Sequence, residues 1–340
     1  FARALATSGA AADLPVVTAE IGDPWLFGTG GDPQKVAAYR ALLAVVAERA
    51  DRGDSAEVEA ARRSLLLVGE HTWGLDQKTW LPDDVRWDRA GLAEVRATAE
   101  GRRFESSWAE QRAYLDAAGS ALGIDPWAVA RIDPGPHGDL GMVASDVAGA
   151  GWEARWDLVT GALVGLRHVR SGRVFADPAH PLGLVTYQSF DERDYERFYA
   201  GLTPSPDDEW WARWDNTKPG IDRAGAASGR WAPSEARTRF TVPGDDLVVL
   251  TLARFDPDLV DRLGAPAEGT TVWTFGADGG IGLELSWDDK AANRLPEAIW
   301  CSFVPAVAEP DRWMLHKLGR AVSPLDVVGH GGRALHAVDL

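Results

Sequence analysis

The chain has 340 residues, of which 45% are hydrophobic and 25% charged, and its formal net charge at pH 7 is −16. That charge argues against nucleic acid as a partner, because nucleic-acid binding needs Lys and Arg to neutralise phosphates. No apolar run reaches the roughly 18 residues that a membrane-spanning helix needs. The single cysteine, Cys301, excludes an intramolecular disulfide and any cysteine-based zinc site.

The chain begins with Phe1 instead of Met, and residues 1–12 have neither the basic nor the apolar part of a signal peptide. We therefore expect it to be an internal piece of a longer protein. The missing leader then says nothing about the compartment, which stays open, although the single cysteine slightly favours the cytoplasm. The length predicts two or three domains.

The first predicted element is a short buried strand over residues 14–23, which leads into a polar loop. Glu20, Asp23 and Trp25 lie at its end. In an α/β barrel that end faces the active site. One hypothesis is therefore that the two carboxylates bind sugar hydroxyls and that Trp25 lines a subsite. The alternative is an ordinary turn that Asp23 caps beside Pro24.

Helices are predicted over residues 33–132. Asp32 caps the first helix and Pro33 occupies its first position. A second helix begins near Asp54, with Glu57 as its capping-box partner. The predicted apolar stripe of the first helix is Val36, Tyr39, Leu43 and Val46, and that of the second is Val58, Ala61, Leu65 and Val68.

Three shorter patterns complete this helical region. A third helix is predicted around residues 92–99, and Ser107 with Glu110 is predicted to cap a fourth. A fifth starts at Asp125-Pro126. The side chains predicted to point inward from the fourth helix are Trp108, Leu115, Ala118 and Leu122.

After residue 136 the period changes from 3.6 to 2, and short apolar runs alternate with Gly, Asp and Pro. This pattern is typical of an antiparallel sheet. Strands are predicted at 152–156, 163–169, 184–187, 236–242, 247–253, 270–275, 282–286 and 299–304, with an amphipathic helix at 191–202. Helices followed by strands predict an α+β multidomain chain with a β-sandwich.

The second helix leads directly into Glu70-His71-Thr72-Trp73-Gly74-Leu75-Asp76. A neutral imidazole at a helix end can bind Zn²⁺, but one histidine supplies one of the four ligands usual for zinc. The alternative is a histidine that caps the helix or belongs to its core. Gly74 is predicted to stop the helix.

This segment resembles the corresponding part of glycoside hydrolase family 38, the α-mannosidase-like enzymes. An uncharacterised group of family-38-like proteins has the same order of residues. Here that order is carried by Glu20, Gly22, Asp23, Trp25, Asp32, Pro33, Tyr39, Arg40 and residues 70–76. Segments 294–300 and 323–328 match the same group, and for these we expect a role in packing the sandwich onto the catalytic part.

The resemblance implies that residues 1–32 are the C-terminal remnant of an α/β barrel, 33–136 a helical bundle and 137–340 a β-sandwich domain. It makes His71 a ligand of a Zn²⁺ ion that holds the sugar, with the other zinc ligands upstream. Glu20, Asp23, Trp25, Trp73 and Asp76 would bind the carbohydrate substrate.

The resemblance also implies a retaining glycosidase, whose nucleophile and acid/base lie upstream of Phe1. Thr72 stands where typical members have Asp, which puts the metal site and the sugar specificity in doubt.

The competing hypothesis is a non-catalytic module that binds glycan or a partner protein. Its basis is the content of sixteen tryptophans, because flat aromatic faces suit sugar C–H surfaces. For most of the sixteen we expect the ordinary role of filling cores. The sequence does not indicate which sugar or linkage is bound, or the oligomeric state.

Overall fold

The structure is a computed structural model that describes residues 31–53, 55–70, 74–81, 83–130, 142–202, 213, 217–317, 320–323 and 325. The chain divides into two compact units, one formed by Phe1–Phe27 with Ala308–Leu340 and the other by Gly28–Val307. The predicted barrel strand at residues 14–23 lies outside the described residues.

Helix α2 (Pro33–Asp51) begins as predicted. The carboxylate of Asp32 accepts a hydrogen bond from the amide of Lys35 at 3.1 Å, and Pro33 follows the cap. The predicted apolar stripe is wrong by about one residue, because Leu43 is 40% exposed and only Val46 of the predicted set is buried. The buried row is Lys35, Ala38, Leu42 and Val46.

A row of alanines explains this shift. Ala38 of α2, Ala61 of α3 (Ala56–Glu70) and Ala118 of α6 (Ala99–Leu122) are all fully buried in one apolar cluster. Small side chains let the helix backbones approach closely, so the alanine row faces the core and the larger row beside it stays at the flank.

Helix α3 keeps the predicted stripe, with Val58, Ala61, Leu65 and Val68 all buried. Its first residue, Ala56, agrees with the prediction of a helix that begins near Asp54. The hydroxyl of Ser55 accepts a hydrogen bond from the amide of Val58 at 3.3 Å, whereas Asp54 lies outside the described residues. Serine is among the preferred N-cap residues because its short side chain reaches the free amides of the first turn.

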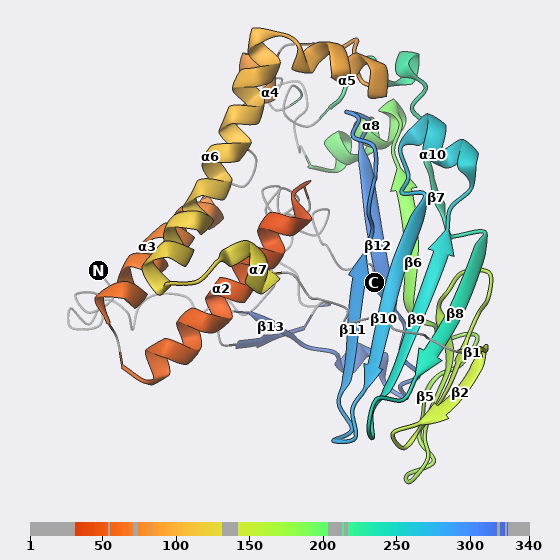
Figure 1. The fold of residues 1–340 in the computed structure, drawn as a ribbon. Coiled ribbons are helices and arrows are strands. Elements are labelled where there is room, and N and C mark those ends of the chain that lie inside the picture. The colour runs from red at the N-terminus through yellow and green to blue at the C-terminus, as the bar shows by residue number, and fades with distance from the viewer. Residues whose placement is uncertain are drawn as a thin grey trace. The chain divides into compact units, whose positions relative to one another are not determined.

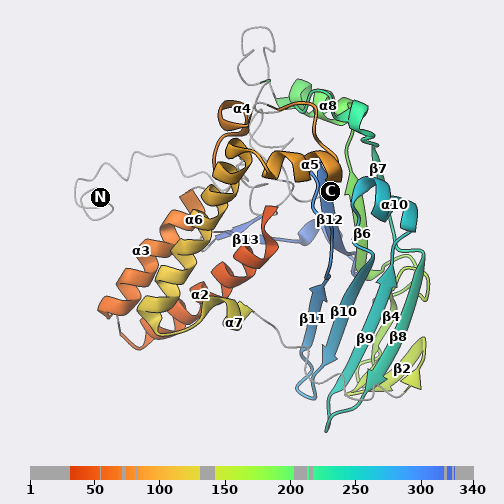
Figure 2. The ribbon, with the colours of Figure 1, turned by 45° about the horizontal axis from the view of Figure 1, so that its top comes forward.

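The fourth predicted helix starts earlier than expected. Helix α6 is capped by Thr98, whose hydroxyl accepts a hydrogen bond from the amide of Gly101 at 3.0 Å. Ser107 therefore lies inside the helix and donates to the carbonyl of Phe104. Leu115, Ala118 and Leu122 are buried as predicted, but Trp108 is 42% exposed. Figures 1 and 2 show α6 running beside α3.

Three short helices complete this part. They are α4 (Gln77–Trp80), α5 (Arg89–Arg96) and α7 (Pro126–Ala130). Asp88 caps α5, where Leu92 and Val95 are buried. A small cluster joins the segment around α4 to α5 and α6. It is made of Leu81, Val95 and Phe104, with Leu75 packed against it.

The strands follow one another along the chain as predicted, and β1 to β12 form two antiparallel sheets (Figure 1). The five-stranded sheet has the order β1-β8-β9-β10-β11, and the seven-stranded sheet follows β12-β6-β4-β3-β2, with β5 on β4 and β7 on β6. The strands of the five-stranded sheet are β1 (Met142–Val143), β8 (Glu235–Thr241), β9 (Leu247–Arg254), β10 (Glu268–Phe275) and β11 (Ile281–Ser286). Those of the other sheet are β2 (Asp146–Gly149), β3 (Trp152–Trp156), β4 (Leu163–His168), β5 (Val174–Ala176), β6 (Leu182–Ser189), β7 (Gly229–Trp231) and β12 (Glu297–Phe303).

The two sheets share one apolar core. Trp152, Trp156 and Leu163 come from the seven-stranded sheet, and Trp273 and Phe275 from the five-stranded one. In β3, alternate side chains point inward, because its residues are buried and exposed in turn. The predicted change from helix to antiparallel strand is therefore confirmed, and the chain is of the α+β class.

Further helices accompany the sheets. The amphipathic helix α8 (Glu192–Leu202) was predicted, whereas α10 (Pro257–Leu263) was not. A 3-10 turn, η3, covers Ile221–Ala224. In the other compact unit, the described residues form the 3-10 turn η4 (Pro310–Arg312) and a hairpin of β13 (Leu315–Lys317) with β14 (Arg320–Val322).

Candidate functional site

Most of the predicted site residues fall outside the described part of the chain. Glu20, Asp23, Trp25, His71 and Trp73 all do so, and the structure places none of them. Asp76 is the predicted site residue that is described. The site is therefore built from the elements on either side of residues 71–73.

The first of these elements is the end of α3. Its buried stripe continues to Val68, and the helix ends at Glu70, directly before His71 in the sequence. Gly74 has a φ of +80°, a left-handed conformation that favours glycine. The helix is described as far as Glu70, and Gly74 has the conformation of a glycine that follows a helix, while residues 71–73 between them lie outside the described residues.

The second element is the segment from Gly74 to Trp80, which rests on α6. The amide of Leu75 donates to the hydroxyl of Ser107 at 3.2 Å. A Cβ placed on Gly74 would lie 2.7 Å from Oγ of Ser107 and 2.9 Å from Cδ1 of Trp108. This close approach requires glycine at position 74 and fixes the chain just after residues 71–73.

Asp76 stands at the start of α4 with an exposed side chain. Its carboxylate accepts a hydrogen bond from the hydroxyl of Thr79 at 2.7 Å, and its carbonyl accepts one from the amide of Trp80 at 3.0 Å. Asp76 therefore caps the short helix and keeps its carboxylate at the surface. This local role is compatible with the predicted contact to a sugar and does not require it.

Two partly exposed indoles lie along α6 near this segment. Trp80 is 37% exposed, and the guanidinium of Arg103 lies 3.6 Å from its ring centroid. Trp108 packs edge-on against Phe104 with 6.2 Å between ring centroids. The sequence predicted Trp108 to point inward with Leu115, Ala118 and Leu122; those three residues are buried, whereas Trp108 lies beside Gly74 and is 42% exposed.

Other residues of the family-38-like pattern have structural roles. Asp32 forms two hydrogen bonds with the guanidinium of Arg112, both at 2.8 Å, in addition to capping α2. Tyr39 packs against the cluster of α2, α3 and α6. Bidentate pairs of this kind fix geometry, so Asp32 ties the start of α2 to α6.

No metal site is complete within the described residues: they contain no group of three or more His, Cys, Asp or Glu side chains that could hold a metal ion. Cys301 is half-buried, and burial raises the pKa of its thiol to about 11. The thiolate that a metal or an electrophile would need is therefore disfavoured at neutral pH.

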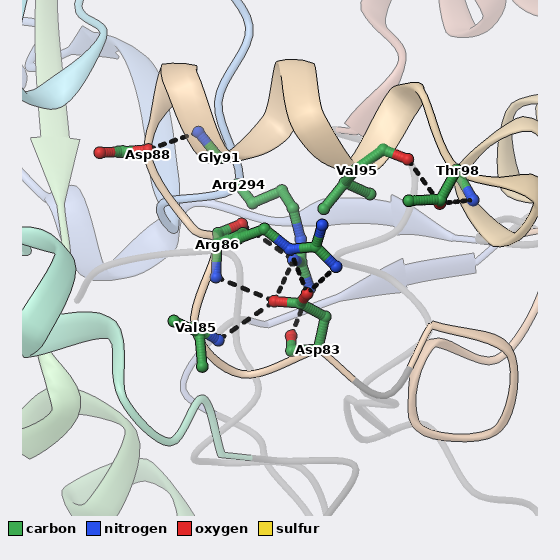
Figure 3. Close-up of polar contacts among 9 residues, drawn as sticks. Asp83, Val85, Arg86, Asp88, Gly91, Val95, Thr98 and Arg294 are labelled. Atoms are coloured by element: carbon green, nitrogen blue, oxygen red, sulfur yellow. Dashed lines mark hydrogen bonds and ion pairs between the residues drawn. The ribbon is translucent and has the colours of Figure 1, made fainter.

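The most perturbed carboxylate in the described part is Asp83, which the sequence did not single out. Burial alone would raise its pKa, but the backbone amides of Arg86 and Val85 and the guanidinium of Arg86 outweigh burial and lower the pKa to about 2 (Figure 3). The amides donate to one carboxylate oxygen at 2.8 and 3.1 Å. Asp83 therefore stays ionised and serves as a fixed acceptor.

A second buried polar group surrounds Tyr187. Its hydroxyl lies 2.6 Å from the carbonyl of Leu263 and 2.8 Å from the carboxylate of Glu297, which Lys290 contacts at 2.5 Å. Burial raises the pKa of Tyr187 strongly, and the neighbouring Glu297 raises it further. The tyrosine is thus a neutral donor that joins β6 to the connections around it.

The tryptophans of the sheets mainly fill the core. Trp152, Trp156 and Trp273 are at most 6% exposed, and Trp87 is 3% exposed. A ring buried in this way has no face to offer a sugar. These four described tryptophans therefore give no support to a glycan-binding surface.

No helix in the described part is both long and apolar enough to cross a membrane. A search of curated proteins found no match. The model of one protein family, described as a domain of unknown function (DUF5054), matches residues 29–279, about three quarters of the chain. The match begins just before α2 and ends between β10 and β11. Since it covers the helices and most of both sheets, the chain belongs to the DUF5054 family.

Proposed function

We propose that this chain is part of a metal-dependent retaining glycosidase that resembles the α-mannosidases of glycoside hydrolase family 38. The observation that carries the proposal is the way α3 ends. Its apolar stripe stays buried to Val68, the helix is described as far as Glu70, and His71 is the next residue in the sequence. A histidine that follows the last turn of a packed helix is well placed to serve as a metal ligand.

In this proposal His71 is one ligand of a Zn²⁺ ion, and the remaining ligands belong to a barrel upstream of Phe1. Residues 1–32 are the end of that barrel, 33–136 a helical bundle and 137–340 a β-sandwich domain. When bound, the zinc ion would orient the sugar through its hydroxyls. Glu20, Asp23, Trp25, Trp73 and Asp76 would contact the substrate.

The anchoring of residues 74–80 supports this assignment. Ser107 and Trp108 hold Gly74 and Leu75 against α6, and Asp76 presents its carboxylate at the surface five residues after His71. Catalytic and binding groups must be held within about 0.5 Å of their working geometry. Support on both sides of residues 71–73 is what such a site requires.

The test uses the full-length parent protein, with zinc measured by mass spectrometry and turnover measured on an aryl α-mannoside. His71→Ala is expected to lose zinc and activity together while the helices stay folded, because in this proposal the imidazole binds the metal and does not contribute to the buried stripe of α3. His180→Ala is the matched control. His180 is 42% exposed and its ring contacts Asp177 at 2.9 Å in a turn of the seven-stranded sheet.

The 340-residue chain alone should hydrolyse no aryl glycoside, because retaining hydrolysis needs two opposed carboxylates and the proposal places both upstream. Turnover by this chain, or a parent whose activity survives His71→Ala, would overturn the proposal. A parent that binds glycan but has neither zinc nor turnover would favour a non-catalytic binding module instead.

A further inference from the structure

The connection between β11 and β12 contacts the helical part of the chain through Arg294. One nitrogen of its guanidinium donates to the carbonyl of Arg86 at 2.9 Å and lies 3.3 Å from the carboxylate of Asp83. The other nitrogen donates to the carbonyl of Asp83 at 2.8 Å (Figure 3). A residue that lies 211 positions away in sequence thus holds the turn before α5.

Packing and a backbone bond reinforce these contacts. The guanidinium carbon lies 4.5 Å from the ring centroid of Trp87, close enough for a cation–π interaction. The amide of Arg294 donates to the carbonyl of Trp87 at 2.7 Å. We call Asp83, Arg86, Trp87 and Arg294 the Arg294 junction. Arg294 contacts this one turn through a carboxylate, an aromatic ring and three backbone carbonyls.

The Arg294 junction is firmly fixed on the sheet side. The side-chain amide of Asn293 donates to the carbonyl of Leu263 at 3.0 Å. Leu295 is 4% exposed and belongs to the same apolar cluster as Trp87 and Tyr187. The residues on both sides of Arg294 are therefore anchored in the sheet region, so its guanidinium is presented to Asp83 from a rigid support.

The charged side chains of Arg294 and Asp83 are both largely buried. The side chain of Arg294 is 10% exposed and that of Asp83 is 12% exposed. Replacing Asp83 leaves Arg294 buried without the carboxylate that it contacts, which is far more destabilising than breaking an exposed pair. Replacing Arg294 leaves Asp83 paired with Arg86, but it removes the hydrogen bonds from the guanidinium to the backbone of the turn. Burial lowers the pKa of Arg294, whereas the neighbouring carboxylate of Asp83 raises it. The carboxylate therefore favours the charged form of the arginine that burial disfavours.

We propose that the Arg294 junction is a conformational latch that closes the connection between α4 and α5 onto the sheets. With the latch closed, the helices and the sheets unfold together. With Arg294 replaced, residues 83–96 detach locally while the core between the two sheets stays folded. This inference does not depend on the proposed glycosidase function, and it gives a role to the segment 294–300, whose packing role was predicted from the sequence.

The test is hydrogen–deuterium exchange of the whole 340-residue chain, with mass spectrometry to resolve segments. In Arg294→Gln the amides of residues 83–96 are expected to exchange at least about tenfold faster, while those of β9 keep their wild-type rates. Trypsin provides a second readout, because the bonds after Arg86 and Arg89 become accessible when the turn opens. Arg63→Gln is the matched control, since Arg63 is 79% exposed in an ion pair with Glu59.

Two further variants keep the proposal falsifiable. Arg294→Lys retains the charge but cannot reach Asp83 and Arg86 with one planar group, so it is also expected to speed exchange in residues 83–96. Asp83→Asn opens the junction from the other side and serves if Arg294→Gln does not fold. Wild-type exchange in Arg294→Lys, or faster exchange spread equally over residues 83–96 and β9, would overturn the latch.

Discussion

At the scale of single residues, carboxylates in this structure fix turns and helix starts. Asp32, Asp83 and Asp88 each accept backbone amides, and Asp32 and Asp83 also bind arginine. Ionised acceptors form stronger hydrogen bonds than neutral ones. Asp83 carries the largest consequence, because its lowered pKa makes the stability of the turn depend on pH.

The acid dependence of Asp83 can be predicted with its sign. Its pKa falls from 3.8 to about 2 on folding, so the ionised group stabilises the fold fully above about pH 4 and loses this effect as the pH falls towards 2. We expect Asp83→Asn to lower the free energy of unfolding at pH 7 and the difference from wild type to shrink by about 2 kcal/mol between pH 4 and pH 2. Urea denaturation across this range measures it, and a difference that stays constant down to pH 2 would contradict the assigned pKa.

At the scale of elements, the helix starts show which side chains serve as N-caps. Asp32 and Asp88 are caps whose acceptors meet the amide three residues on. Two short polar residues, Thr98 and Ser107, are of a type that can cap α6, and in the structure the cap is Thr98. The reason is that the helix from Thr98 onward buries Phe104 against Leu81 and Val95, contacts that a start at Ser107 would forgo.

The choice of cap gives a prediction for α6. Thr98→Ala is expected to lower the free energy of unfolding by about 1 kcal/mol, because it leaves the amide of Gly101 without its acceptor. Ser106→Ala, at an exposed position inside the same helix, should be neutral or slightly stabilising, since alanine has the higher helix propensity. Thermal denaturation followed by circular dichroism measures both. A larger loss in Ser106→Ala than in Thr98→Ala would place the helix start elsewhere.

At the scale of the whole molecule, two main cores are joined by a third cluster. One core lies among α2, α3 and α6, and another lies between the two sheets. The third cluster brings Trp87 of the helical part together with Tyr187, Phe255 and Leu295 of the sheet region. Because this cluster and the Arg294 junction span both parts, we expect helices and sheets to unfold in one transition.

Cavities in either core test this cooperativity. Leu115→Ala in the helices and Leu247→Ala in the sheets each remove a fully buried side chain, so each should cost about 2–5 kcal/mol. Both are expected to shift the same urea transition, whether it is followed by circular dichroism or by tryptophan fluorescence. Leu66→Ala, at a position 73% exposed, should change stability by less than about 0.5 kcal/mol. Two separate transitions, with only one shifted by each variant, would show that the parts are independent.

The sequence alone determined the features that depend on neighbours along the chain. Local spacing and turn chemistry explain the buried stripe of α3, the cap of α2, the left-handed Gly74 that follows α3 in the sequence, and the alternation in β3. The order of motifs around His71 also stands in the sequence, and the function drawn from it remains a proposal.

Only the tertiary structure decided which of several possible faces is buried. The alanines of three helices select the inward row of α2, and Phe104 selects the start of α6. Trp108 was predicted to be buried with Leu115, but it is 42% exposed. The pairing of Arg294 with Asp83 spans 211 residues. No local pattern encodes such a contact, because its partners are brought together only when the helices and the sheets pack.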